Sequence, residues 1–128
     1  MKPETSRWAD KARRDLAAAR RDLDAGDPDN AVVRTYYAAF HAATAALCES
    51  GRAAKTHAGT QTLFFQTFVQ DVGTFEPSLS RTLSRLQQHR ESADYGVRAP
   101  DAETARESIE QATAFVDAVG AWLAGRPA

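Results

Sequence analysis

The sequence predicts an all-α protein, a bundle of five helices joined by short connections. Apolar residues recur every three or four positions along most of the chain, the spacing that places them on one side of a helix. Glycine, proline and capping residues separate these segments, and no segment alternates between apolar and polar residues as a half-buried strand would. Because 128 residues is the length of one domain, we expect residues 1–128 to form a single helical domain.

The first helix is expected to start at Thr5 or Ser6, either of which can cap it, and to end near Ala25. Its apolar side carries Trp8, Ala12, Leu16, Ala19 and Leu23. Its other side carries opposite charges four residues apart, which predicts a solvated, salt-bridged surface. These pairs are Asp10–Arg14, Lys11–Asp15 and Arg20–Asp24.

The second helix is predicted to begin with Asp27 as its N-cap and Pro28 in its first turn. The connection at Gly26 is so short that this helix should run antiparallel to the first. Residues 30–48 are apolar nearly all round and rich in alanine. Such a helix is typically central in a bundle, because neighbours can approach it closely on more than one side.

Three further helices complete the predicted bundle. Thr56 can cap the third helix, which should end at Gly73. The fourth helix should run from about Ser78 to Tyr95, and Asp101 can cap the fifth. The expected apolar side of the third helix consists of Leu63, Phe64, Phe65, Phe68, Val69 and Val72. Those of the last two consist of Leu79, Leu83, Leu86 and Ala93, and of Ala105, Ile109, Ala112, Val116, Val119 and Leu123.

The central helix carries two strongly polar residues, Arg34 and His41, on its otherwise apolar surface. They are seven residues apart, so they fall within about 20° of each other around the helix, with Tyr37 between them. Buried polar groups are costly unless they are paired or used. A structural interpretation is that Arg34 pairs with Asp94 of the fourth helix, while His41 donates to a carbonyl or a tyrosine hydroxyl.

Three stretches, in this order, resemble the HEPN domains of prokaryotes. They are Arg34-Thr-Tyr-Tyr-Ala-Ala-Phe-His41-Ala-Ala, Lys55-Thr-His57-Ala-Gly59 and Arg90-Glu-Ser-Ala-Asp94-Tyr95. Over about residues 8–124 the chain is most similar to the small stand-alone HEPN proteins that are often encoded beside a minimal nucleotidyltransferase. The resemblance implies an up-and-down four-helix bundle with an additional short helix, commonly as a homodimer.

The resemblance also implies a chemistry. Many HEPN proteins are metal-independent endoribonucleases whose signature is an arginine, four to six residues and a histidine, and Arg34 and His41 match it with six between them. Two features depart from the pattern: the signature lies on the second helix rather than a late one, and Ala43 stands where toxin members carry a tyrosine that a nucleotidyltransferase can modify. An imidazole can move protons near neutral pH, and a guanidinium can hold a phosphate. Cleavage needs both a general acid and a general base, and one imidazole can hardly serve as both. The mechanism therefore predicts a composite site in a homodimer, to which each chain contributes an Arg34/His41 pair.

Binding residues are expected in all three stretches. They are Tyr37, Lys55, His57, Arg90, Asp94 and Tyr95. Two structural alternatives stay open. Capping by Thr56 accounts for the second stretch as well as phosphate binding at a helix N-terminus does, and a helix-end bracket accounts for the third.

Composition limits the other possibilities. With 16 basic and 17 acidic residues the net charge is −1, which argues against a general attraction to nucleic acid but leaves room for a local basic patch. The single Cys48 excludes an internal disulfide, and the three histidines lack metal-ligand spacing, so neither metal nor cofactor is expected. No membrane span or signal peptide is evident, which favours a cytoplasmic location.

We therefore expect a HEPN protein of a toxin–antitoxin or nucleotidyltransferase-associated system that cleaves RNA through Arg34 and His41. The alternative is a non-catalytic HEPN module that docks a partner nucleotidyltransferase or a nucleotide. A third possibility is an interaction protein in which the polar row only holds the bundle together.

Overall fold

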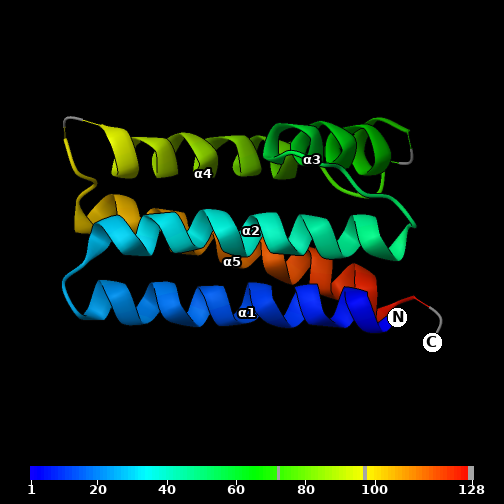
Figure 1. Cartoon of the computed structure of the whole chain (residues 1–128), viewed down its shortest axis with the longest axis horizontal. Coiled ribbons are helices and arrows are strands. Elements are labelled where there is room, and N and C mark those ends of the chain that lie inside the picture. Colours follow the sequence, from blue (N-terminus) through cyan, green and yellow to red (C-terminus); the bar gives the residue numbers. More distant parts are fainter. Residues whose placement is uncertain (72, 97, 127–128) are drawn as a thin grey trace.

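The computed structural model describes residues 1–71, 73–96 and 98–126, and all regular secondary structure within these ranges is helical. Its elements are α1 (Pro3–Asp24), α2 (Pro28–Glu49), α3 (His57–Phe64), the π-helical segment η1 (Phe65–Asp71), α4 (Pro77–Tyr95) and α5 (Ala102–Ala124). Figure 1 shows α1, α2, α4 and α5 running alternately in opposite directions, with the short α3 beside α2 and α4. The predicted up-and-down four-helix bundle with an additional short helix is confirmed.

Capping side chains start three of the helices as predicted. The carboxylate of Asp27 accepts from the Asn30 amide, the Thr56 hydroxyl accepts from the Gly59 amide, and Asp101 accepts from the Thr104 amide. Each of these oxygens satisfies a helix-end N–H group that has no partner inside its helix.

The start of α1 differs from the prediction. The helix begins at Pro3 with Lys2 as its N-cap, so Thr5 lies in the first turn, where it is buried. Proline is favoured at the first helical position because its fixed φ suits the helix and its missing N–H group is not needed there. Pro3 therefore extends the helix beyond the expected hydroxyl cap.

Alanine makes α2 the centre of the bundle. Seven of its alanines are buried, and α1, α4 and α5 all pack against it. These alanines are Ala31, Ala38, Ala39, Ala42, Ala43, Ala45 and Ala46. Large side chains fill the space around them, and those that are completely enclosed include Tyr36, Phe64, Leu83, Leu86 and Phe115. The predicted central position of the second helix is confirmed.

The third predicted helix is α-helical in its first half and π-helical in its second. After α3, the chain continues from Phe65 with the wider π-helical turn, in which hydrogen bonds span five residues instead of four. Phe64 and Phe68 are buried, whereas Phe65, predicted to face inward, is 39% exposed. Val72, which was placed on the same apolar side, lies outside the described residues.

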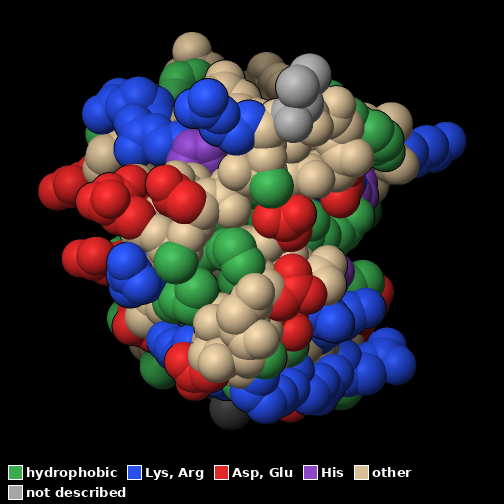
Figure 2. All heavy atoms as spheres, turned by 90° about the vertical axis from the view of Figure 1, so that its left-hand side faces the viewer, with side chains coloured by type: hydrophobic (Ala, Val, Ile, Leu, Met, Phe, Trp, Pro, Cys, Tyr) green, Lys and Arg blue, Asp and Glu red, His purple; other side chains and the backbone are tan. Residues whose placement is uncertain are grey.

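Charged side chains of both signs cover the surface. In Figure 2, basic side chains gather at the top over α4 and at the bottom over α1, with acidic side chains between them. Of the predicted charge pairs on α1, those of Asp10 and Asp15 are wrong: Asp10 bonds Arg13 at 3.2 Å, and Asp15 contacts α2. Among the described helices, none is long and apolar enough to span a bilayer.

Candidate functional site

A groove between α1 and α2 brings together the polar row of the central helix. Arg34, Tyr37 and His41 line a cavity of about 460 Å³ with Lys11 and Asp15 of α1. Asn30 and Val33 complete its walls. The spacing predicted that Arg34, Tyr37 and His41 share one face, and the structure places all three on this one cavity.

His41 is held by a carboxylate that sequence reasoning missed. Its Nδ1 lies 2.6 Å from Oδ2 of Asp15, and the two side chains are only 9% and 16% exposed. A carboxylate can only accept, so Nδ1 carries the proton in the neutral ring and Nε2 presents its lone pair. The rings of Trp8 and Tyr37 stack with the imidazole at 5.3 and 6.0 Å between centroids, which further restricts its orientation.

Arg34 is much more accessible than His41. Its side chain is 51% exposed, and its Nε donates to Oδ2 of Asp22 on α1 at 3.1 Å. The alternative that paired Arg34 with Asp94 is wrong, because Asp94 lies beside Arg90 instead. In the described part of the chain, the terminal nitrogens of Arg34 have no hydrogen-bond acceptor. They are the groups with which a guanidinium would hold a phosphate.

The two acidic partners follow from the geometry of an antiparallel helix hairpin. Asp22 contacts Arg34 nearer the turn, and Asp15 contacts His41 farther from it. In such a hairpin, moving away from the turn along one helix is matched by a similar distance along the other, so successive contacts have similar spacings on both helices. The signal was therefore in the sequence: two acidic residues seven apart on the first helix mirror Arg34 and His41, seven apart on the second.

Tyr37 connects the groove to a second cluster, which the other two motifs supply. Nη1 of Arg90 donates to the Tyr37 hydroxyl at 3.3 Å, and the guanidinium lies 5.1 Å from the centre of the Tyr36 ring. On the other side of Tyr36, its hydroxyl is 2.9 Å from Nδ1 of His57. His57 also packs on Phe40, with 4.2 Å between ring centroids. The structure thus brings Tyr37, His57 and Arg90 together.

Burial sets the protonation of this second cluster. It lowers the pKa of His57, and the nearby charges of Arg90 and His41 lower that pKa further. Burial also raises the pKa of Tyr36, with the positive charge of Arg90 acting in the opposite direction. Tyr36 therefore stays a phenol and donates to a neutral His57 near pH 7.

The remaining predicted binding residues lie outside the groove. Asp94 is 3.8 Å from Nη1 of Arg90, one turn earlier on α4, as the helix-end bracket interpretation expects. Lys55 is exposed in the connection before α3, and Tyr95, at the end of α4, is 82% exposed. No described contact joins Lys55 or Tyr95 to Arg34 or His41. Within the described residues, no three histidine, cysteine or acidic side chains gather as metal ligands would.

Known proteins resemble this chain in sequence and in fold. The family model for the HEPN domain matches residues 5–122. A "UPF0332 protein" of Thermotoga maritima is 31% identical over 113 residues, which cover 88% of this chain and 85% of the relative. "Putative toxin MJ0605" of Methanocaldococcus jannaschii is 37% identical over 90 residues, 70% of this chain and 66% of the relative.

A solved structure extends the likeness to the fold. TT1696 from Thermus thermophilus superimposes with a TM-score of 0.80, over 94% of this chain and 98% of that one, at 20% sequence identity. At that identity the likeness concerns the fold alone. The family match covers nearly all of the described helices, including the three stretches that resemble HEPN domains. This chain therefore belongs to the HEPN domain family.

Proposed function

We propose that this chain is the RNA-cleaving HEPN protein of a toxin–antitoxin or nucleotidyltransferase-associated system, and that the α1–α2 groove is its active site. One observation carries the proposal: Arg34 and His41 line the same open cavity, with His41 fixed by Asp15 at 2.6 Å. A relative named as a putative toxin supports the biological setting. We propose a cytoplasmic location for the protein, where it would encounter its RNA substrate.

His41 is suited to the role of general base. With Nδ1 bonded to Asp15, the lone pair of Nε2 can take the proton of an RNA 2′-hydroxyl, which then attacks the adjacent phosphorus. The 5′-oxygen of the next nucleotide leaves, and the products are a 2′,3′-cyclic phosphate and a 5′-hydroxyl. The reaction needs no metal ion, since protein groups supply both the proton transfer and the positive charge.

Arg34 is suited to the phosphate. Negative charge grows on the non-bridging oxygens as the 2′-oxygen attacks, and a forked guanidinium donor stabilises it. The side chain is half exposed and anchored through Nε to Asp22, so its terminal nitrogens remain available to a substrate. An anchored donor loses less freedom on binding than a mobile one.

The leaving 5′-oxygen also needs a proton. We propose that this chain forms a homodimer in which two α1–α2 grooves face each other, so that the partner's imidazole serves as the acid. Sedimentation velocity tests this directly: a dimer is expected, and a strictly monomeric protein that still cleaves RNA would contradict the composite site.

The cleavage assay uses purified protein and mixed RNA in EDTA. Wild type should cleave, His41→Ala should lose about 10²–10⁴-fold in rate, and Arg34→Ala about 10²–10³-fold. Arg13→Ala is the matched control, because Arg13 is also an exposed arginine bonded to an aspartate of α1. Equal cleavage by all four proteins would mean contamination or another site, and would overturn the proposal.

One observation favours a second candidate function. His41 is 9% exposed, and Ala43 replaces the tyrosine that is modified in toxin members, so the groove could serve as a non-catalytic docking site for a nucleotidyltransferase or a nucleotide. The same assay separates the two. A protein that binds RNA or nucleotide without cleaving it, and whose binding falls in Arg34→Ala, would be the binding module.

A further inference from the structure

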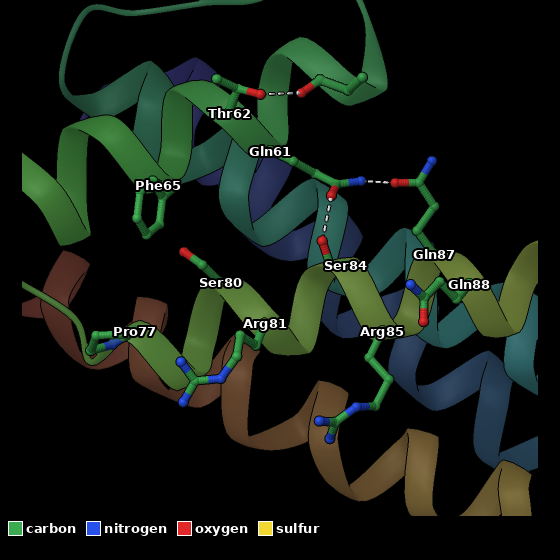
Figure 3. A pocket seen from close by; sticks show the side chains of 11 residues that line it. Gln61, Thr62, Phe65, Pro77, Ser80, Arg81, Ser84, Arg85, Gln87 and Gln88 are labelled. Carbon is green, nitrogen blue, oxygen red and sulfur yellow. Dashed lines mark hydrogen bonds between the residues drawn. The ribbon is translucent and has the colours of Figure 1, made fainter.

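A second and larger cavity lies between α3 and α4. It has a volume of about 640 Å³ and is lined by eleven residues of α3, η1 and α4. Figure 3 shows its two walls, with Gln61 and Phe65 on one side and Ser80, Arg81 and Arg85 on the other. None of the residues that line it lines the α1–α2 groove.

The lining of this cavity is basic. It includes Arg81 and Arg85 but no aspartate or glutamate. The two arginines are one turn apart on α4 and both are exposed, and Figure 3 shows both guanidinium groups extending from the side of α4 that lies away from Gln61 and Phe65. Within the described part of the chain neither forms an ion pair, unlike Arg34 and Arg90. Two unpaired cations at this spacing form the local basic patch that the net charge left room for.

Hydrogen-bonding groups face the same space. The side-chain amide of Gln61 bonds Gln87 across the gap and accepts from the Ser84 hydroxyl at 3.3 Å. Gln87 in turn donates to Glu91, one turn farther along α4. The hydroxyl oxygen of Ser80 is buried without a partner among the described residues. Buried polar atoms are normally satisfied, so this hydroxyl lacks the hydrogen-bond partner that such atoms usually have.

An aromatic ring completes the cavity. Phe65 is 39% exposed and projects from the first residue of η1 toward α4, where Figure 3 shows it opposite Ser80. A large apolar ring kept partly in water beside cations and amides offers a flat surface for stacking. Nucleic-acid bases stack on such rings whatever their sequence.

We propose that the α3–α4 cavity binds a nucleotide of single-stranded RNA. Arg81 and Arg85 hold its phosphate, and the base stacks on Phe65 within reach of the Gln61 amide. The choice of RNA among polyanions rests on the proposed function, but binding at this cavity does not require cleavage. The cavity gives the strand a second anchor in addition to the α1–α2 groove.

The test measures binding to an RNA that the protein cannot cleave. The probe is a fluorescein-labelled 2′-O-methyl oligonucleotide of about 12 nucleotides, a typical length for single-stranded sites, and anisotropy is read over a series of salt concentrations. Wild type is compared with Arg81→Gln/Arg85→Gln, with Phe65→Ala and with a control, Arg21→Gln/Arg106→Gln. The control removes the same charge from exposed positions that line neither cavity.

The two kinds of variant should behave differently. Each phosphate contact on a single strand contributes about 0.7 to the slope of log K against log salt, and the two arginines share one phosphate, so the Arg81/Arg85 variant should lose about 0.7 from that slope. Phe65→Ala should weaken binding about 5- to 150-fold with the slope unchanged, because stacking releases no counterions. The control should keep both affinity and slope near those of wild type, and thermal melts should show all four proteins folded.

Several results would overturn the proposal. One is an Arg81/Arg85 variant whose slope of log K against log salt falls no more than that of the control. Another is an Arg81/Arg85 or Phe65 variant that alters only self-association in sedimentation velocity, since the cavity would then be a contact between copies. A cavity that binds AMP as tightly as the oligonucleotide would be a mononucleotide site instead. RNA binding that depends on Arg81 and Arg85 in a protein without cleavage activity would sustain this inference while removing the proposed function.

Discussion

The contact between Asp15 and His41 makes the sharpest prediction. Asp15→Asn keeps the size and shape of the side chain, but its NH₂ group can donate to Nδ1 of His41, from which Asp15 now accepts a hydrogen bond at 2.6 Å. The ring proton would then move to Nε2, the nitrogen that must take the 2′-hydroxyl proton. When a catalytic histidine is held in the wrong tautomer, the rate falls by up to about 10⁴-fold, so we expect a loss of about 10²–10⁴-fold in RNA cleavage.

The assay must separate this effect from a loss of folding. A loss of 10²-fold corresponds to about 2.7 kcal/mol in the barrier. By contrast, Asn can still make a hydrogen bond with His41, so the free energy of unfolding should fall by no more than about 1.5 kcal/mol. We would compare initial cleavage rates in EDTA, urea unfolding, and the affinity for 2′-O-methyl RNA, which should not change. Wild-type cleavage by Asp15→Asn would refute the assignment of Asp15 as a positioning residue.

Three further predictions concern stability and its separation from function. Arg34→Ala should change the free energy of unfolding by less than about 1 kcal/mol, because its ion pair is half exposed, and a larger loss in urea unfolding would mean a structural role. Leu86→Ala, at a fully buried core position, should lower that free energy by about 2–5 kcal/mol; a loss under about 1 kcal/mol would show that the core is packed differently. His57 has a lowered pKa in the folded state, so as the pH falls below about 6.5 the unfolded chain takes up its proton first and stability decreases. His57→Gln should flatten this decrease between about pH 7.5 and 5.5, and parallel curves for the two proteins would contradict the assigned burial.

Most of the fold could be predicted because its signals are local. Asp27, Thr56 and Asp101 each satisfy an amide three residues ahead, so a capping residue in the sequence identifies the helix start. Likewise, the alanines of residues 30–48 predicted that other helices pack closely against α2 on more than one side. The start of α1 was placed late because Pro3 competes successfully with the hydroxyls of Thr5 and Ser6.

The π-helical turn and the partners of the site depend on contacts between distant residues. Nothing in the residues from Phe65 onward distinguishes a wide turn from an α-helical one. Phe75, which follows in the loop, stacks on Phe64. The bond from Arg90 to Tyr37 spans 53 positions, and no periodicity predicts it. The matching seven-residue spacings of Asp15 and Asp22 and of Arg34 and His41 pointed to the contact of Asp15 with α2, but the spacing of Asp15 to Lys11 suggested a simpler pair on the same helix.

The central claim is that Arg34 and His41 cleave RNA by attack of its 2′-hydroxyl, and the ends of the products test it most directly. Mixed RNA would be incubated with wild type and with His41→Ala in EDTA, and the fragments analysed by mass spectrometry. We predict 2′,3′-cyclic phosphate and 5′-hydroxyl ends from wild type and no specific fragments from the variant. Fragments with 5′-phosphate ends, or cleavage that appears only when Mg²⁺ is added, would contradict the account.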